Sequence, residues 1–496
     1  MTNYSKYKEL LRKIADVQYA SAVLNWDQET YMPPKGAEFR AQQLSTLAGI
    51  AHELSTTEEL GELLEHLKNE DSLTEKEKRN VKESLKKYKD NKKYTTEFVQ
   101  QLSKTISEAF QSWQKAKSEN NFSIFAPYLE KLVKLKRDEC CLLGFQTHPY
   151  DALLDQYEPE AKTADLEVLF ADVRSQLVDF VKQIAAKPQN QESFMFAHYN
   201  IQKQWDFGMN LLKQMGYDFD AGRQDISSHP FTTNFSSEDV RVTTRIKEND
   251  LNEMIWSCIH EGGHALYEQG LPASEYGLPS GEYISLGIHE SQSRLWENNV
   301  GRGLSFWKAN YKKLNETFPE NLKSVSVNDF YKAMNIVKPS LIRTSADELT
   351  YHFHVLIRFE IEKALIEGSL EVKDLPGYWN KKYKEYLGID VPSDAQGVLQ
   401  DIHWSHGSFG YFPTYSLGSF YAAQFYAFAK KDIPNLESEI ENGNMSPLLD
   451  WLRLKVHKYG KFNTAKDLCI IITGEKLNFK YFMDYAKIKY SKLYDL

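Results

Sequence analysis

The sequence predicts a mostly helical protein with one small antiparallel β element. Apolar residues return every three or four positions over long stretches, and only one segment has the composition of strands. No strands alternate with helices as they would in a parallel sheet, and no internal repeat is present. At 496 residues the chain is two to three times as long as a typical domain. We expect one large helical domain over residues 1–496.

Charge and composition exclude several classes of protein. Lys and Arg number 60 and Asp and Glu 69, so the net charge is −9 and lacks the basic surplus of a nucleic-acid or anionic-membrane binder. No apolar stretch approaches the roughly 18 residues that span a bilayer. The amino terminus interleaves charged and apolar residues, unlike a secretory signal, and four cysteines make no disulfide framework. We expect a soluble cytoplasmic protein without nucleic-acid or membrane partners.

Residues 1–220 are predicted to form a helical lobe with little visible chemistry. Leu60, Leu64 and Leu67 follow helical spacing among charged residues, which is typical of a helix with one buried face. The segments Ser55–Glu58 and Thr74–Glu77 have the pattern of capping boxes, in which a hydroxyl and a carboxylate satisfy free backbone N–H groups. Each segment therefore predicts the start of a helix.

Residues 229–245 are the segment that resembles strands. Val240 and Val242 alternate with polar residues, and Ser236–Asp239 is a polar turn, so a short hairpin is predicted. His229 precedes a proline and is biased towards extended backbone. Helical patterns then return to the C-terminus, with the chemistry concentrated in residues 221–420 and further helices in 421–496.

The motif that carries chemistry is His260-Glu261-Gly262-Gly263-His264. On a helix, residues four apart share a face, so both imidazoles can reach one Zn²⁺ while Glu261 lies beside them as a general base. Asp250 begins this helix as a cap, and Gly270 and Pro272 end it. Two interior glycines cost roughly 1 kcal/mol each relative to alanine, so we expect tight packing against another element.

Two zinc histidines require a third protein ligand. Glu290 lies 26 residues after His264, in a helical segment that ends at Gly301, and would complete a site with an open position for water. His289 is a rival ligand, but adjacent residues on a helix point about 100° apart, so only one of the two can face the metal. We favour Glu290. Cys258, two residues before His260, is predicted to be a small core residue.

Six motifs resemble, in order, those of the Taq-type thermostable metallocarboxypeptidases, which are HExxH enzymes with a glutamate as third ligand. The first three are His229-Pro230-Phe231, Asp239-Val-Arg241-Val-Thr243 and His260–His264. The last three are His289-Glu290-Ser291-Gln292, Ile342-Arg343-Thr-Ser-Ala346-Asp347 and Gly397-Val-Leu-Gln400-Asp401-Ile-His403-Trp404. The segment Trp26–Pro33 is also similar to the family, so the resemblance extends over the whole chain.

The resemblance implies properties that composition and spacing do not establish. It implies a nearly all-helical body with a deep groove and the zinc at its floor. It implies a metallocarboxypeptidase, a peptide hydrolase that releases C-terminal amino acids with broad specificity. It also implies a homodimer.

The oxyanion of the reaction needs hydrogen-bond donors beyond the metal, and one good donor is worth about 3–4 kcal/mol. The segment His403–Tyr415 contains Gly407 and Gly410, which would let a loop bring hydroxyls over the site. We predict Tyr415 and His403, followed by Tyr411, as catalytic residues. Packing in the core or at the rim is the alternative for each tyrosine, because the chain holds 29 of them.

A carboxypeptidase must also hold the terminal carboxylate of its substrate. The planar fork of an arginine suits this, and Arg343 is the first candidate, with Arg241 and Arg245 as competitors. An ion pair with Asp347, one helical turn on, is the alternative for Arg343. His229 either contacts substrate or packs in the core.

The functional prediction is therefore a zinc metallocarboxypeptidase, with cobalt or manganese as possible metals. One alternative is an oligopeptidase that cuts internal bonds by the same chemistry. The other is a catalytically silent peptide-binding protein of the same fold. The presence of Glu261 argues against that last class, because binding zinc does not require it.

Overall fold

The computed structural model describes residues 2–496 and shows a mostly helical chain with one three-stranded sheet, so the predicted fold class is confirmed. The chain divides into two units. Unit 1 consists of Met1–Asn91, Asn190–Met334 and Tyr421–Asn478, and unit 2 of Lys92–Gln189, Asn335–Phe420 and Phe479–Leu496. Each unit takes residues from all three of the predicted segments 1–220, 221–420 and 421–496. Among residues 2–496, no helix has the length and hydropathy needed to cross a bilayer.

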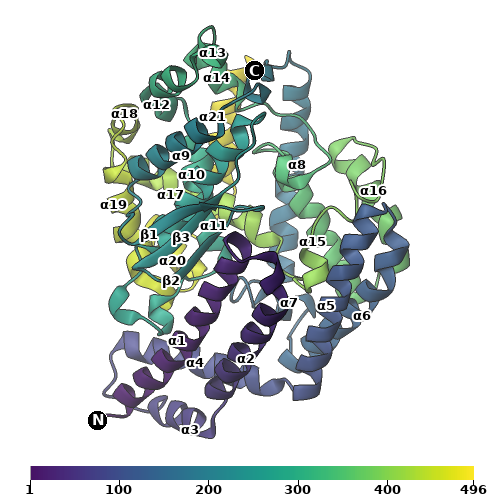
Figure 1. Cartoon of the computed structure of the whole chain (residues 1–496), viewed down its shortest axis with the longest axis vertical. Helices are drawn as coiled ribbons and strands as arrows, with labels where there is room; N and C mark the ends of the chain where they lie inside the picture. The colour runs from purple at the N-terminus through teal and green to yellow at the C-terminus, as the bar shows by residue number, and fades with distance from the viewer. Residues whose placement is uncertain (1) are drawn as a thin grey trace. The chain divides into compact units, whose positions relative to one another are not determined.

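Unit 1 contains the sheet, which lies beside α1 and α10 (Figure 1). Its first helices are α1 (Asn3–Thr30), α2 (Ala37–Ser55), α3 (Glu58–Leu67), α4 (Glu75–Lys93, ending in unit 2) and α9 (Ile201–Met215). After the sheet come α10 (Leu251–Glu268), α11 (Leu286–Arg294), α12 (Leu304–Thr317), α13 (Pro319–Leu322) and α14 (Val327–Ala333). The last are α18 (Leu436–Glu441), α19 (Ser446–Lys455) and α20 (Ala465–Thr473).

The sheet has the strand order β1-β3-β2. β2 (Thr232–Ser236) and β3 (Asp239–Thr244) form the predicted antiparallel hairpin, and Val240 and Val242 are buried as their alternation predicts. β1 (Gly222–Ile226) pairs in parallel with β3 and was not predicted. Its buried side chains are Gln224 and Asp225, so it carries no apolar alternation by which a sequence could reveal a strand.

The two glycines of α10 allow the close packing that the sequence predicts. A methyl group at Gly263 would lie 2.7 Å from the Cα of Ser293 and 2.8 Å from the carbonyl oxygen of Gln292, both on α11. A methyl group at Gly262 would lie 2.7 Å from Cδ2 of Leu212 on α9. α10 therefore lies between two helices, and the one that carries Glu290 approaches it backbone to backbone.

The helix termini test the predicted caps. Asp250 caps α10 by accepting a hydrogen bond from the backbone N–H of Asn252, and Thr74 and Glu77 form a reciprocal box at the start of α4. The prediction for Ser55 is wrong, because Ser55 ends α2 and Thr57 caps α3 by accepting from the N–H of Leu60. Three consecutive hydroxyl residues, Ser55 to Thr57, precede this helix, and the one directly before it forms the cap.

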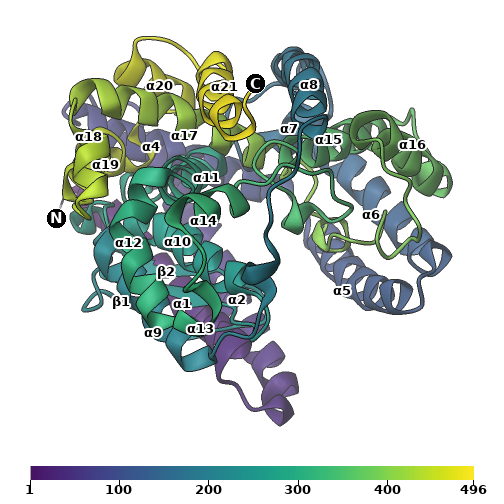
Figure 2. The ribbon, with the colours of Figure 1, turned by 90° about the horizontal axis from the view of Figure 1, so that it is seen from above.

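Unit 2 is helical in its described residues. Its helices are α5 (Thr96–Ser118), α6 (Phe122–Leu143), α7 (Tyr150–Leu154), α8 (Thr163–Ala185), α15 (Tyr351–Glu367), α16 (Leu375–Leu387), α21 (Lys480–Tyr494) and the first part of α17 (Pro413–Asp432). Figure 2 shows α5 beside α6 and α16 beside α15. The ring of Phe359 on α15 lies 5.0 Å from that of Phe170 on α8, so these two helices pack through aromatic side chains.

We expect Gly263→Ala to lower the free energy of unfolding by about 1–3 kcal/mol, because the methyl group has no room against backbone atoms. Gly49→Ala is the matched control. Gly49 is exposed inside α2, and a methyl group there meets nothing within 4 Å. That variant should be more stable by about 0.5–1 kcal/mol. Urea titrations of both variants test this, and equal effects would contradict it.

Candidate metal centre and active site

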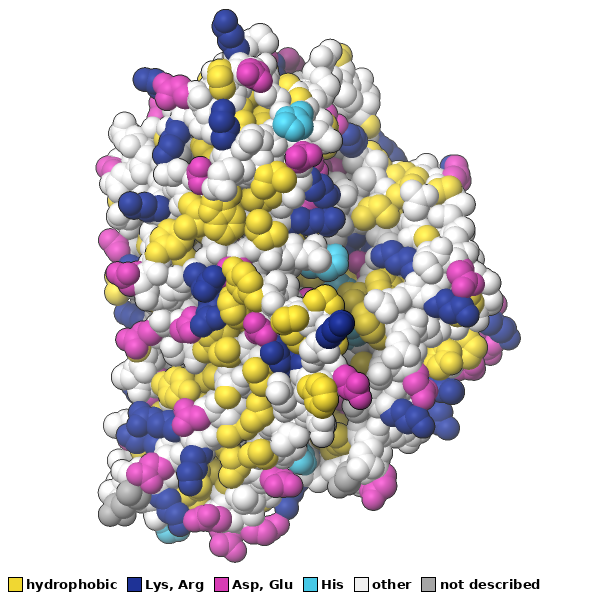
Figure 3. Space-filling model, in the orientation of Figure 1, with side chains coloured by type: hydrophobic (Ala, Val, Ile, Leu, Met, Phe, Trp, Pro, Cys, Tyr) yellow, Lys and Arg dark blue, Asp and Glu magenta, His cyan; other side chains and the backbone are white. Residues whose placement is uncertain are grey.

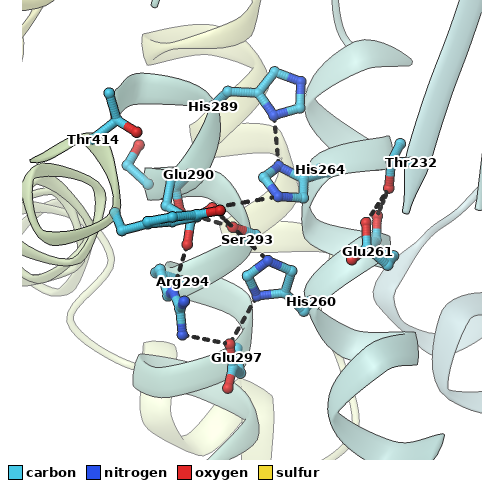
Figure 4. Close-up of polar contacts among 12 residues, drawn as sticks. Thr232, His260, Glu261, His264, His289, Glu290, Ser293, Arg294, Glu297 and Thr414 are labelled. Atoms are coloured by element: carbon cyan, nitrogen blue, oxygen red, sulfur yellow. Dashed lines mark hydrogen bonds and ion pairs between the residues drawn. The ribbon is translucent and has the colours of Figure 1, made fainter. Parts of the chain in front are cut away.

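Three side chains of unit 1 bring possible metal ligands together, His260 and His264 from α10 and Glu290 from α11 (Figure 4). The Nε2 atoms of His260 and His264 lie 3.8 and 3.6 Å from Oε2 of Glu290. Ligands about 2.0–2.2 Å from a tetrahedral Zn²⁺ are separated by about 3.3–3.6 Å. The donor types suit that ion, the His264–Glu290 spacing lies at the end of this range, and the His260–Glu290 spacing is slightly wider. Elsewhere in residues 2–496, no trio of His, Cys, Asp or Glu gathers in this way.

Arg294 orients the carboxylate of Glu290. Its Nε donates to Oε1 at 2.6 Å, one helical turn along the same helix. The other oxygen, Oε2, faces the two imidazoles and has Ser293 Oγ at 3.4 Å. Glu290 therefore presents one oxygen to the position between the histidines.

A carboxylate supports His260. The Nδ1 atom of His260 lies 2.8 Å from Oε2 of Glu297, which is in the π-helix Leu295–Gly301 that continues α11. Arg294 and Arg302 donate to Glu297 at 3.2 and 3.1 Å. Burial alone would raise the pKa of Glu297, but the two arginines and His260 hold it well below its usual range. Burial would also lower the pKa of His260, and Glu290 and Glu297 outweigh that effect and raise it.

The rival ligand His289 lies behind His264. Its Nδ1 is 2.5 Å from the Nδ1 of His264, and its Nε2 is 2.8 Å from Oε1 of Glu268. His264 directs its other nitrogen, Nε2, towards Glu290. Figure 4 shows His289 and His264 in line on the side away from His260. His289 is therefore not among the three converging ligands.

The general-base candidate Glu261 lies on α10 beside these ligands and is buried. Thr232 of β2 reaches it from the hairpin, with Oγ1 2.7 Å from Oε2 of Glu261 (Figure 4). Burial raises the pKa of Glu261, although His260 and the Thr232 hydrogen bond oppose the shift. The hairpin thus fixes the direction of this carboxylate.

The four candidates for substrate chemistry form one cluster within unit 2. His403 Nε2 lies 3.2 Å from the Tyr415 hydroxyl, and the ring of Tyr411 lies 5.2 Å from that of Tyr415. The guanidinium of Arg343 lies 4.9 Å from the centre of the Tyr415 ring. Desolvation, together with the charge of Arg343, lowers the pKa of His403 to about 3, so its imidazole is neutral.

Arg343 forms an ion pair, but the partner predicted from the sequence is wrong. Arg343 does not pair with Asp347; its Nε donates to Oδ1 of Asp401 at 3.0 Å, and its Nη1 to the Tyr351 hydroxyl at 3.0 Å. Asp401 also accepts from Nε of Arg358 at 2.6 Å. Residue 343 starts a 3-10 turn and not an α-helix, so the four-residue spacing to Asp347 brings no contact.

The remaining candidates are placed as follows. Arg241 forms a bidentate pair with Asp239 at 2.9 Å and lies 4.3 Å from the Trp26 ring, so its guanidinium is occupied within unit 1. His229 is exposed before β2, which excludes core packing. Arg245 follows β3 and is half-buried. Cys258 is buried with Sγ near Gln224, as predicted for a small core residue.

Comparison with known proteins identifies this architecture. The family model described as carboxypeptidase Taq (M32) metallopeptidase matches residues 6–490. The chain belongs to this family. It is therefore a metallocarboxypeptidase, and the family resemblance of its motifs is confirmed.

Three relatives illustrate the match to the M32 family. Carboxypeptidase 1 of Bacillus subtilis (strain 168) is 41% identical over 495 residues, covering 99% of each chain. The M32 carboxypeptidase from Deinococcus radiodurans R1 superimposes with a TM-score of 0.98 at 37% identity, covering 100% of each chain. The carboxypeptidase of Pyrococcus furiosus superimposes with a TM-score of 0.97 at 36% identity, covering 99% of each chain.

Several residues around the M32 metal centre were not predicted. Arg294 and Glu297 follow Glu290 by four and seven residues, and Glu268 follows His264 by four. These spacings place side chains on the same helical face, so the signal was present. Thr232 has no such signal, because it reaches Glu261 through the packing of β2 on α10.

Glu362 of α15 anchors the loop of this carboxypeptidase that joins His403 to Tyr411. Its Oε1 accepts from the Trp404 indole at 2.8 Å, and its Oε2 accepts from the Gly410 N–H at 2.8 Å and the Tyr150 hydroxyl at 2.6 Å. Gly410 has φ +94°, and a methyl group there would lie 2.7 Å from the backbone carbon of Leu153. Burial raises the pKa of Glu362 to about 7 against these three hydrogen bonds.

This raised pKa predicts a contribution to stability that depends on pH. Folded protein binds the Glu362 proton more tightly than unfolded protein, so the contribution is present below about pH 4.5 and is lost as pH rises through 7. Glu362→Gln, which cannot ionise, should escape a loss on the order of 3 kcal/mol. Urea titrations at pH 5 and pH 8 measure it, with the exposed Glu385→Gln as control. Parallel pH profiles for wild type and Glu362→Gln would disprove it.

Proposed function

We propose that this M32 carboxypeptidase uses zinc to release C-terminal amino acids from peptides with broad specificity. The convergence of two imidazole Nε2 atoms and one carboxylate oxygen within 4.8 Å supports this. Two neutral imidazoles and one carboxylate suit Zn²⁺, and Co²⁺ or Mn²⁺ also bind to such ligands. His260, His264 and Glu290 would hold the ion, with Arg294 and Glu297 keeping the side chains in place.

When bound, zinc supplies the Lewis acidity that makes water a nucleophile near neutral pH. Glu261 is the group of this chain that would accept the proton of the attacking water and pass it to the departing amine. The hydrogen bond from Thr232 holds Oε2, so Oε1 of Glu261 is the oxygen left for that proton transfer. Burial of Glu261 keeps bulk water from competing for it.

Arg343 is proposed to bind the terminal carboxylate of the substrate. Two guanidiniums, those of Arg343 and Arg358, share the single carboxylate of Asp401, which leaves one positive charge uncompensated in that cluster. The described hydrogen bonds of Arg343 use Nε and Nη1, so Nη2 remains for a ligand. His403, Tyr415 and then Tyr411 are proposed to donate hydrogen bonds to the developing oxyanion.

The two alternatives that the sequence left open make different demands on the site. An oligopeptidase would cut internal bonds and would not need a free substrate carboxylate, and a silent peptide-binding protein would not turn over. The uncompensated positive charge of the cluster of Arg343, Arg358 and Asp401 favours a carboxypeptidase. We retain a role for Arg241 or His229 with substrate as a proposal from the motifs, and a homodimer as one from the family resemblance. A cytoplasmic location is retained as a proposal from the composition and the pattern of the amino terminus.

Glu261→Gln should abolish peptide hydrolysis, with a loss of at least about 10²–10⁴-fold in kcat, because the amide cannot accept the proton. Its zinc content should stay at one ion per chain, since the three ligands remain. Glu253→Gln is the control, because Glu253 lies on the same helix and pairs with Lys247 instead. Full activity in Glu261→Gln would remove Glu261 as the general base.

A ten-residue peptide with either a free or an amidated C-terminus separates the proposed functions. Zinc-loaded enzyme should produce a ladder of single-residue losses from the free acid and none from the amide, as followed by mass spectrometry. Arg343→Lys should raise KM for the free acid by about 10-fold or more, because it removes the bidentate fork. Arg241→Lys is the comparison. Internal fragments from both peptides would instead establish an oligopeptidase, and a larger KM effect in Arg241→Lys would transfer the carboxylate-binding role.

A further inference from the structure

Behind His264 lies a chain of hydrogen bonds that the proposed chemistry does not use. His289 stands between His264 and Glu268, with nitrogen–nitrogen and nitrogen–oxygen distances of 2.5 and 2.8 Å. The second oxygen of Glu268, Oε2, accepts from the side-chain amide of Asn234 at 2.8 Å. Glu268 is only 2% exposed, and its described hydrogen-bond partners lie within the protein.

We propose that His289 and Glu268 are positioning residues that hold His264 in the tautomer able to bind metal. This inference rests on the proposed metal site at His260, His264 and Glu290. It gives a role to His289, which the sequence offered as an alternative to Glu290 for the third ligand.

The positions of the protons follow from the contacts. Binding metal through Nε2 requires the lone pair of that atom, so the proton of a neutral His264 must be on Nδ1. His289 must then accept at its own Nδ1, and its proton must be on Nε2, where it donates to Glu268. Every donor in this arrangement meets an acceptor. In the reverse arrangement His264 would carry its proton on Nε2, where it would block the metal.

The two histidine ligands are supported differently. His260 contacts Glu297, whose charge Arg294 and Arg302 compensate. Within residues 2–496, no Lys or Arg forms an ion pair with Glu268, whose polar partners are His289 and the Asn234 amide. Its negative charge is therefore available to polarise His289 and, through it, His264. Carboxylates behind a histidine ligand raise its basicity, and their loss typically weakens metal binding 10–100-fold.

Packing is the competing explanation, because the His289 ring also lies against the rings of Tyr267 and Tyr283, at 5.4 and 5.0 Å. The variants must therefore separate shape from hydrogen bonding. His289→Phe keeps a packed ring and removes the side-chain acceptor, while the backbone of residue 289, which also hydrogen-bonds His264, stays in place. His289→Asn loses the ring but places an amide oxygen near the position of Nδ1. Glu268→Gln keeps an acceptor for His289 and removes the charge.

The experiment measures the zinc dissociation constant of each full-length variant by competition with a chromophoric chelator, and the thermal midpoint of each metal-free form. We expect affinity to fall about 10–100-fold in His289→Phe, to remain within about 3-fold of wild type in His289→Asn, and to fall by an intermediate factor in Glu268→Gln. Tyr283→Leu, which removes the ring that packs on His289, is the packing control and should bind zinc within about 3-fold of wild type.

Unchanged zinc affinity in a folded His289→Phe would overturn the proposal. An equal loss in His289→Phe, His289→Asn and Tyr283→Leu would also overturn it, because that pattern reports packing. Failure of the wild type to bind Zn²⁺, Co²⁺ or Mn²⁺ would remove the proposed metal site itself, which is a different result. If Glu261 proved not to be the general base, the zinc affinities of these variants would still test the role of His289 and Glu268.

Discussion

The close approach of α10 and α11 at Gly263 is the constraint on which the metal centre depends. His260 and His264 are four residues apart and share a face through helix geometry alone. Glu290 is on another helix, and its oxygen reaches both imidazoles because nothing larger than hydrogen separates Gly263 from the backbone at Gln292 and Ser293. A glycine that appears to weaken the helix in the sequence therefore sets the distance between ligands from different elements.

Two of the buried carboxylates around these ligands, Glu290 and Glu297, are paired with arginines. Arg294 donates to both Glu290 and Glu297, and Arg302 donates to Glu297. Removing one partner of a buried pair leaves an uncompensated charge, which costs several kcal/mol. The continuation of α11 as a π-helix contributes, because it carries Glu297 to the Nδ1 of His260. On the surface, by contrast with this buried cluster, acidic and basic side chains are interspersed over the face drawn in Figure 3.

Sequence patterns predicted the parts of the fold that local periodicity determines. The buried stripe of Leu60, Leu64 and Leu67, the Asp250 cap of α10 and the hairpin all have signals within a few residues. β1 and the contact of Thr232 with Glu261 do not, because each depends on residues far away in sequence. The error over Arg343 has the same origin. A helical spacing suggested Asp347, whereas the partner Asp401 lies 58 residues away.

The arginine cluster of unit 2 shows what such long-range pairing provides to a carboxypeptidase. A buried guanidinium without an anion is expensive, and among residues 2–496 Asp401 is the one carboxylate that forms ion pairs with Arg343 and Arg358. Asp401 keeps Arg343 in place through Nε, the Tyr351 hydroxyl accepts from Nη1, and the charge that remains has no carboxylate of its own among the described contacts. A substrate that brings a carboxylate would compensate that charge, and an amidated or internal peptide segment would not. Under the role proposed for Arg343, selection of chain ends therefore arises from one missing negative charge.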